Sequence, residues 1–197
     1  MKTYDSFVVH LPKRINDTIS LSNGLELYVD TRFNEFEYRV NEGEVTAIPF
    51  KHKTPVEVGD TLYFHHLVVI NDGQYLVGVK DHYLVKFSPD AAINNQAIGF
   101  KSKKTGMFYP LDGWSVLAPY DEPKKKLSEI IDVVELNEPA VTKGVVAFDS
   151  DELKEAGLKK GDVVGFKKNH DYRFKIDGLE YYRTRVEDLL YVQTEEV

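Results

Sequence analysis

Histidine side chains are the first residues of this sequence that could do chemistry. The pair His65-His66, with His52 or His82, could supply nitrogen ligands to a metal ion. Adjacent residues of a strand point to opposite faces of a sheet, so His65 and His66 are not expected to bind one ion together. We therefore interpret them as strand positions and predict no metal site.

Three acidic residues, Asp149, Asp151 and Glu152, also lie close together. They stand where a short helix over residues 151–156 is predicted to begin, and negative charge there stabilises the helix dipole. Ser150 is placed to cap the first amides, and Gly157 to end the helix in a left-handed conformation. The acidic cluster is therefore interpreted as a helix start.

The sequence contains no cysteine, no glycine-rich phosphate loop, no Ser-His-Asp order and no zinc signature. We expect no catalytic residue and no cofactor, and we do not expect an enzyme. The net charge of -7 argues against a protein that mainly binds nucleic acid, because neutralising phosphates needs a basic face. A small barrel that binds single strands through aromatic and lysine-bearing faces is a weaker alternative.

Composition and the N-terminal segment set the expected location. The chain is 42% hydrophobic, which is ample for a packed core. No apolar run approaches the roughly 18 residues of a membrane helix. Residues 1–7 lack the apolar core of a secretion signal. We therefore expect no membrane partner and a cytoplasmic location.

Structural landmarks occur twice along the chain. Val56–Phe64 and Leu158–Phe166 each contain a Gly-Asp pair inside an apolar run. Glycine supplies the positive φ of a tight turn and aspartate caps neighbouring amides, so a structural role is expected for both pairs. The spacing predicts a first domain over residues 1–95, a junction hairpin over 96–111 and a second domain over 112–197.

The strand signals predict an all-β fold. Short β-branched and aromatic runs alternate with turn residues, and short strands at this spacing must close or stack to hide their edges. Two small tandem β-barrels are the expected architecture. The predicted strands include Phe7–Leu11, Leu67–Ile70, Tyr75–Val79, Trp114–Ala118 and Phe174–Ile176, the last followed by a turn at Asp177-Gly178.

The order of these landmarks resembles the GroES-like co-chaperonin (chaperonin-10) family. The later copy carries the likeness in Gly144-Val145-Val146, in Gly161-Asp162-Val163-Val164-Gly165-Phe166 and in Glu187-Asp188-Leu189-Leu190. The earlier copy departs at its end, where Pro89-Asp90-Ala91-Ala92-Ile93 replaces the closing motif. The resemblance implies two tandem GroES-like small β-barrels with long mobile loops.

The resemblance also implies a function and partners. Such a protein is a co-chaperonin that caps a GroEL-like chaperonin ring and assists protein folding through aliphatic loop contacts. It is a homo-oligomer, with the heptamer as the family's form. Because seven is odd, two side-by-side barrels per chain cannot fill one ring. Stacked tiers, one barrel in the ring, and a different assembly all stay open, as does an interaction protein that kept the fold without chaperonin binding.

Two loops are the candidate chaperonin-binding segments. The first, residues 15–40, resembles the family's glycine-plus-aliphatics motif at Leu25, Leu27 and Val29, with Ile19 and Leu21 as a second register. The second, residues 120–142, lacks the preceding glycine. Core packing is the alternative for both segments, since the first alternates like a half-buried strand and the second could be a packed strand or helix. The candidate residues of the second loop are Ile130, Ile131, Val133 and Val134.

Overall fold

The computed structural model describes residues 2–32, 35–70, 75–89, 95–120 and 141–193. These residues form mostly β-strands, as the sequence predicts, together with three short α-helices. None of the described helices is long and apolar enough to cross a membrane. The chain divides into two compact units, Met1–Trp114 and Ser115–Val197. The helices are α1 Glu35–Tyr38, α2 Leu67–Ile70 and α3 Asp151–Glu155.

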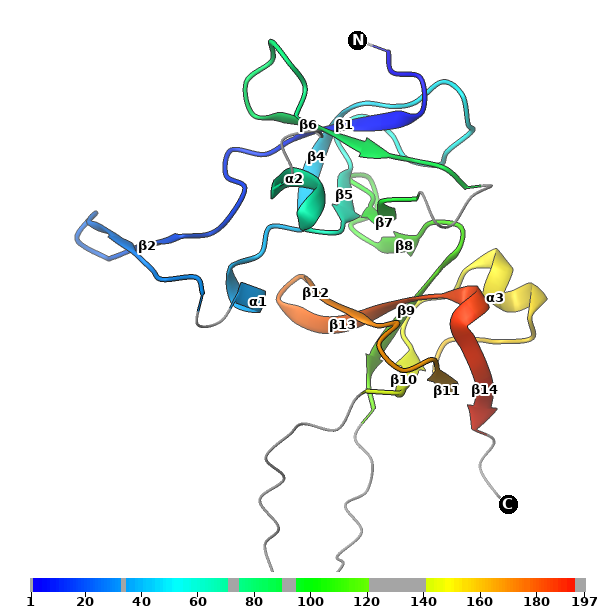
Figure 1. The fold of residues 1–197 in the computed structure, drawn as a ribbon. Helices are drawn as coiled ribbons and strands as arrows, with labels where there is room; N and C mark the ends of the chain where they lie inside the picture. The colour runs from blue at the N-terminus through cyan, green and yellow to red at the C-terminus, as the bar shows by residue number, and fades with distance from the viewer. Residues whose placement is uncertain (1, 33–34, 71–74, 90–94, 121–140, 194–197) are drawn as a thin grey trace, which may run out of the picture. The chain divides into compact units, whose positions relative to one another are not determined.

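The first unit is built on an antiparallel sheet of six strands in the order β6-β1-β4-β5-β7-β8 (Figure 1). A separate two-stranded sheet pairs β2 with β3. The strands are β1 Ser6–His10, β2 Thr18–Ser20, β3 Glu26–Tyr28, β4 Glu42–Ala47, β5 Thr61–Phe64, β6 His82–Lys86, β7 Ala97–Lys101 and β8 Phe108–Pro110.

The second unit has a six-stranded sheet in the order β12-β13-β9-β10-β11-β14. Among the described residues, the pairings leave two edge strands in each sheet, β6 and β8 in the first and β12 and β14 in the second. The strands are β9 Trp114–Pro119, β10 Lys143–Val146, β11 Val163–Phe166, β12 Tyr172–Ile176, β13 Leu179–Arg185 and β14 Leu189–Gln193, with a 3-10 turn at Val186–Asp188.

The two units repeat one strand arrangement. Strands β6, β1, β4, β5 and β7 follow one another in the first sheet as β13, β9, β10, β11 and β14 do in the second. The hydrogen bonds agree as well. Val45 N donates to Asp60 O at 2.8 Å, and Val146 N donates to Asp162 O at 2.9 Å. The repeated sequence landmarks therefore occupy equivalent places in the two sheets.

The Gly-Asp pairs form matching corners, which confirms their predicted structural role. Gly59 and Gly161 have φ angles of 92° and 96°, a region that disfavours residues with a Cβ. The carboxylates of Asp60 and Asp162 each accept a hydrogen bond from the amide three residues earlier, at 2.8 Å and 3.0 Å. Each corner therefore delivers the chain into β5 or β11 with its turn amides satisfied.

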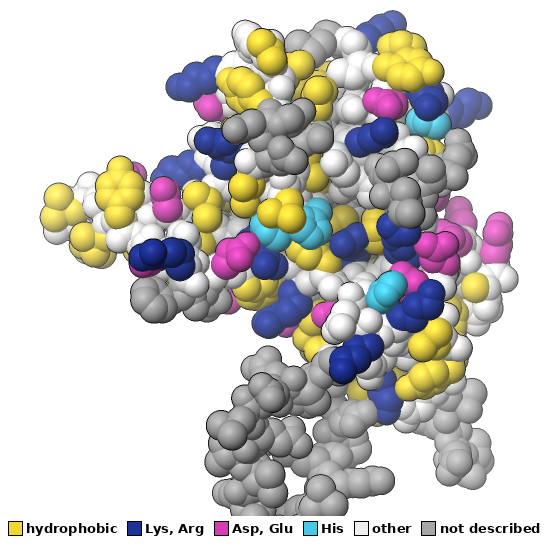
Figure 2. Space-filling view, in the orientation of Figure 1, with side chains coloured by type: hydrophobic (Ala, Val, Ile, Leu, Met, Phe, Trp, Pro, Cys, Tyr) yellow, Lys and Arg dark blue, Asp and Glu magenta, His cyan; other side chains and the backbone are white. Residues whose placement is uncertain are grey.

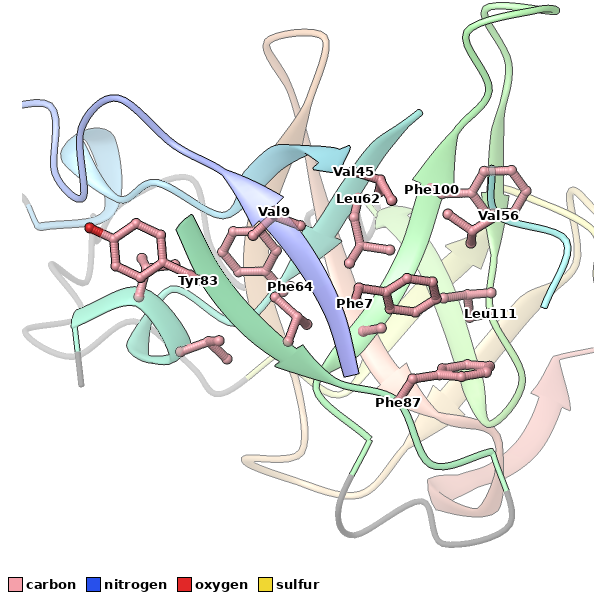
Figure 3. Close-up of a cluster of buried hydrophobic side chains, with 14 of the residues drawn as sticks. Phe7, Val9, Val45, Val56, Leu62, Phe64, Tyr83, Phe87, Phe100 and Leu111 are labelled. Carbon is pink, nitrogen blue, oxygen red and sulfur yellow. The ribbon is translucent and has the colours of Figure 1, made fainter. Parts of the chain in front are cut away.

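Each unit has its own apolar core. In β4 the side chains alternate between buried and exposed, because successive residues of a strand point to opposite faces. The second core includes Leu117, Val146, Leu153, Val164 and Phe166. The first core is shown in Figure 3 and includes Phe7, Val9, Val45, Val56, Leu62, Phe64, Tyr83, Phe87, Phe100 and Leu111.

Two predicted local elements are confirmed. Ser150 accepts a hydrogen bond from Leu153 N at 3.2 Å and caps α3, while Gly157 follows the helix with a φ of 78°. Asp177 and Gly178 both have positive φ and join β12 to β13 in a tight hairpin.

The predicted strand Leu67–Ile70 is wrong, because these residues form α2. Val68 N donates to His65 O at 2.9 Å and Val69 N to His66 O at 3.2 Å, which closes successive helical turns. An apolar run without polar alternation has no period that separates a strand from a buried helical turn. The predicted strand at 75–79 is also absent from the described residues, where Tyr75 forms only an isolated bridge.

Residues 96–111, predicted as a junction hairpin, form β7, a turn with Gly106 at a φ of 69°, and β8. β7 pairs with β5, so this segment extends the first sheet. Ala97 pairs with Phe64 as Leu189 pairs with Phe166. The closing strand of the first unit is therefore β7, which has the place that β14 has in the second unit. Residues 90–94, where the earlier copy departs from the closing motif, lie outside the described residues.

The corners predict unequal losses of stability on mutation. Asp60 is buried and accepts a second amide, Lys103 N, at 2.9 Å, whereas Asp162 is less buried. We expect Asp60→Ala to lower the free energy of unfolding by about 2–4 kcal/mol and Asp162→Ala by about 1 kcal/mol. Urea unfolding followed by circular dichroism measures both. An equal or larger loss for Asp162→Ala would contradict this account of the first corner.

Candidate functional site

The candidate site is an arm, which we define as the described residues between 15 and 39. It leaves the first unit after β1 and returns before β4, and it extends away from the six-stranded sheet of that unit (Figure 1). An antiparallel bridge between Ile15 and Arg39 closes its base, where Asn16 N donates to Tyr38 O at 2.9 Å. These bonds fix where the arm begins and ends.

The outer part of the arm is the β2–β3 hairpin. Its register opposes Thr18 to Tyr28 and Ile19 to Leu27. The tip is held by a hydrogen bond from Leu21 N to Leu25 O at 2.8 Å. Asparagine and glycine are favoured in such turns, because they tolerate the left-handed region and asparagine bonds nearby amides. Here the Asn23 side chain accepts from Leu25 N at 3.1 Å, and Gly24 has a φ of 80°.

One face of the hairpin is apolar and exposed. Strand alternation puts Ile19 and Leu21 on the same side as their cross-strand neighbours Leu27 and Leu25. Leu25 and Leu27 are 59% and 51% exposed, so the core-packing alternative does not describe them. Val29 lies partly buried at the inner end, with its amide bonded to Asp17 O at 2.8 Å. Figure 2 shows hydrophobic side chains gathered on this arm, at the left of the view.

The two registers considered in the sequence form one surface. Ile19 pairs with Leu27, and Leu21 bonds to Leu25 at the tip, so both registers contribute to one hairpin face. The signal that sequence reasoning missed is the Asn23-Gly24 pair between two alternating runs, which is typical of a hairpin. The segment 15–40 is thus not a loop without regular structure.

A polar cluster joins the base of the arm to α2. Glu35 Oε1 lies 3.1 Å from His66 Nε2 and accepts a hydrogen bond from Arg39 Nε at 3.2 Å. Glu35 begins α1 and Arg39 directly follows it, four residues later, so the two side chains can meet on one side of the turn. Burial of the imidazole lowers the pKa of His66, and the Arg39 charge lowers it further, against the opposing effect of Glu35.

The histidines do not have the geometry that the sequence suggested. His65 and His66 lie in the turn before α2 rather than on a strand, and their rings stack with centroids 4.6 Å apart. Their side chains are therefore not on opposite faces of a sheet. In the described ranges, no group of three or more histidine, aspartate or glutamate residues could hold a metal ion.

The second candidate segment falls almost wholly in residues 121–140, which are not among the described residues. Ile130, Ile131, Val133 and Val134 lie outside the described residues. The geometry of the candidate site is therefore that of the first arm, whose apolar face could dock into an apolar groove of a partner.

No protein-family model matches this chain, and the curated proteins contain no match to its sequence.

The cluster at the arm base predicts a pH dependence of stability. Because His66 has a lowered pKa in the folded chain, the unfolded chain binds a proton more readily as pH falls through the ordinary histidine value, about 6.5. Stability from the neutral imidazole is complete above that pH and is lost below it. We expect the free energy of unfolding to fall more between pH 8 and 5 for the wild type than for His66→Gln.

Urea titrations at each pH measure this difference. The titration of Asp188 does not interfere with this comparison of stabilities. Burial raises the pKa of its carboxyl, but hydrogen bonds from Lys167 and His170 outweigh burial and hold the pKa below its ordinary value. That contribution is lost only at more acidic pH. Parallel curves for the wild type and His66→Gln would refute the assignment to His66.

Proposed function

We propose that this protein is a co-chaperonin of the GroES-like kind, which caps a GroEL-like chaperonin ring and assists protein folding. The observation that carries the proposal is the exposed apolar face of the arm. It comprises Ile19, Leu21, Leu25 and Leu27, and it lies outside the core on a hairpin of the first unit. In this proposal, these side chains insert into an apolar groove of the chaperonin.

The order of elements supports the proposal. The first strand of the unit, β1, is followed by the arm, then by β4 with its Gly43-x-Val45 segment, and then by the corner that leads into β5. The arm thus lies where the family has its mobile loop. We propose that each unit is a GroES-like small barrel and that the chain is a tandem pair of them.

The size of the apolar face limits what one arm can contribute. Burying one aliphatic side chain contributes roughly 1.5 to 3 kcal/mol to the free energy of binding. The entropy that two molecules lose on association costs about as much free energy as several such side chains contribute. The hydrogen bonds of the β2–β3 hairpin already define its backbone, which lowers the ordering cost on binding. A single arm should therefore bind weakly but specifically.

An oligomer would bind the chaperonin ring more tightly than a single arm does, because several arms bind at once. Several arms on one assembly act at a high effective concentration, so the complex is tight while all arms engage and dissociates when the chaperonin changes state. We propose a homo-oligomer with arms arranged to match a chaperonin ring, in which the first arm of each chain makes the contact. The proposed role is non-catalytic and needs neither a cofactor nor a membrane or nucleic-acid partner.

One observation favours the alternative, an interaction protein that keeps the fold without chaperonin binding. The arm is closed at its base and paired along its strands, as a structural hairpin would be. The alternative predicts that the arm stays resistant to limited proteolysis and that no chaperonin complex forms.

The arm offers a charge-matched test. Leu25→Asp with Leu27→Asp adds two charges to the apolar face, because both side chains are exposed there. Thr18→Asp with Ser20→Asp adds two charges to the opposite face of the same hairpin. We expect the first pair to lower the affinity for a GroEL-like chaperonin in the presence of ATP at least tenfold, and the second pair to have little effect.

Immobilised protein and surface plasmon resonance measure the affinity, and circular dichroism checks the fold of each variant. Binding that is unchanged in Leu25→Asp with Leu27→Asp would reject the arm as the contact. If the wild type forms no nucleotide-dependent complex with any of a panel of GroEL-like chaperonins, the proposed function fails.

A further inference from the structure

The last strands of the two units, β7 and β14, are structurally equivalent. Each pairs with the strand that follows a Gly-Asp corner, β5 or β11. Each ladder also has a register shift at the same place, between Tyr63 and Phe64 in the first unit and between Gly165 and Phe166 in the second. Equivalent pairs along the two ladders can therefore be compared directly.

The two strands differ sharply in burial. Ile98 is 0% and Phe100 5% exposed in β7, whereas their equivalents Leu190 and Val192 are 59% and 42% exposed in β14. These side chains alternate with Gly99 or Tyr191, so each pair shares one face of its strand. The apolar face of β14 is thus exposed in the second unit, whereas the equivalent face of β7 is buried within the first unit.

In the first unit, β8 lies along the outer edge of β7, and Phe100 also packs in the first core. Tyr109 pairs with Phe100, and their rings stack with centroids 5.4 Å apart. Leu111 N donates to Ile98 O at 2.9 Å, which also satisfies the outer edge of the backbone. In the described part of the second unit, no strand pairs with the outer edge of β14.

A tyrosine fills the other face of β14. In the first unit Tyr63 pairs with Gly99, and in the second Gly165 pairs with Tyr191, so glycine and tyrosine have exchanged places across the ladder. A Cβ on Gly165 would lie 2.3 Å from the Tyr191 ring, which shows how closely the ring covers the glycine. Among the described residues, β14 has no strand at its outer edge, and Leu190 and Val192 stay exposed.

The other described sheet edges carry features that oppose pairing with another chain. Charged residues and proline at an edge, and very short edge strands, discourage association of sheets. β8 has three residues including Pro110, β12 contains Arg173 and Lys175, and β6 ends at Lys86. The five residues of β14, Leu-Leu-Tyr-Val-Gln, include no charge and no proline.

We propose that the outer edge of β14 pairs antiparallel with β14 of a second copy of this chain, so that two second units share one continuous sheet. The strand suits itself as a partner, because none of its five residues brings a like charge opposite its copy. When Tyr191 faces its own copy across the two-fold axis, Leu190 opposes Val192, so each of these side chains gains an apolar cross-strand neighbour. This interface is independent of the proposed chaperonin contact, since the arm belongs to the first unit.

Mass measurements test the pairing. Leu190→Lys with Val192→Lys places two charges on the exposed face of β14, and light scattering after size-exclusion chromatography gives the molar mass. We expect the mass of this variant to be half that of the wild type. Two single variants complete the test: we expect Leu190→Lys to lower the mass, and Leu179→Lys, which adds one charge at another exposed leucine of the second unit, to leave it unchanged. A wild type that is monomeric at all concentrations would overturn the proposal.

Single cysteines identify the partner strand. The sequence has no cysteine, so one cysteine at each position from 189 to 193 in turn reports only self-contact. In a two-fold antiparallel pair, Cα atoms of the self-facing residue are about 4.5–5.5 Å apart. For each residue away from the self-facing position, the two equivalent Cα atoms are offset by a further roughly 7 Å along the strand axis.

We expect oxidation to produce a disulfide-linked dimer efficiently at one position, at or next to 191, and at least fivefold less at positions two residues away. No cross-link at any position, with an oligomeric wild type, would show that β14 pairs with a different edge and would overturn self-pairing. Protected β14 amides in a monomer would show that the chain covers its own edge, which also overturns it. Loss of chaperonin binding in the arm variants bears on the proposed function alone, because those variants keep β14 intact.

Discussion

Both units depend on the corner at which a Gly-Asp pair ties two neighbouring strands together. Gly59 N and Val45 N make reciprocal bonds across this corner, to Val45 O and Asp60 O, both at 2.8 Å. Gly59 makes its bond from a positive φ of 92°, a conformation that glycine adopts without a steric cost. The two bonds fix the register of β4 against β5, and a slip of one residue would turn Glu44 toward the core in place of Val45. The same constraint acts at Gly161 in the second unit.

The units differ in what is attached to this common frame. In the first unit the Asp60 carboxylate also accepts Lys103 N, and Lys104 Nζ lies 2.6 Å from Glu57 Oε2. These two contacts hold the turn of the β7–β8 hairpin against the corner. Strand β8 lies beside β7 in the same sheet. In the described part of the second unit the chain continues past the corner without such a hairpin. The first unit thus ties its last hairpin to the corner through a buried carboxylate, and this hairpin pairs β8 with the outer edge of β7.

The features that could be predicted from sequence are those that dictate backbone angles locally. Gly59, Gly161, Ser150 and the Asp177-Gly178 turn each require or favour one conformation, so their roles follow from residue type. The place of β7 could not be found this way, because strand pairing is decided between segments far apart in the sequence. For Leu67–Ile70, an unbroken apolar run fits a strand and a buried helical turn equally well.

The candidate site shows a different limit of sequence reasoning. Alternation at Leu25 and Leu27 predicts a strand with one apolar face, but the pattern does not say whether another layer covers that face. Coverage depends on the rest of the fold. In the first unit the core is filled by β1, β4, β5, β6, β7 and α2, and the arm is not needed to complete it. Its aliphatic side chains therefore stay exposed although they follow the same period as buried ones.

The two exposed apolar surfaces suit different kinds of contact. On the arm the β2–β3 bonds already satisfy the strand backbone, so a partner gains mainly by burying side chains, and such a contact can be made and broken quickly. At β14 the outer row of backbone groups is itself unpaired within the described sheet, so a partner strand adds directional hydrogen bonds along its length. A surface of the first kind fits a releasable docking site. One of the second kind fits a lasting assembly contact.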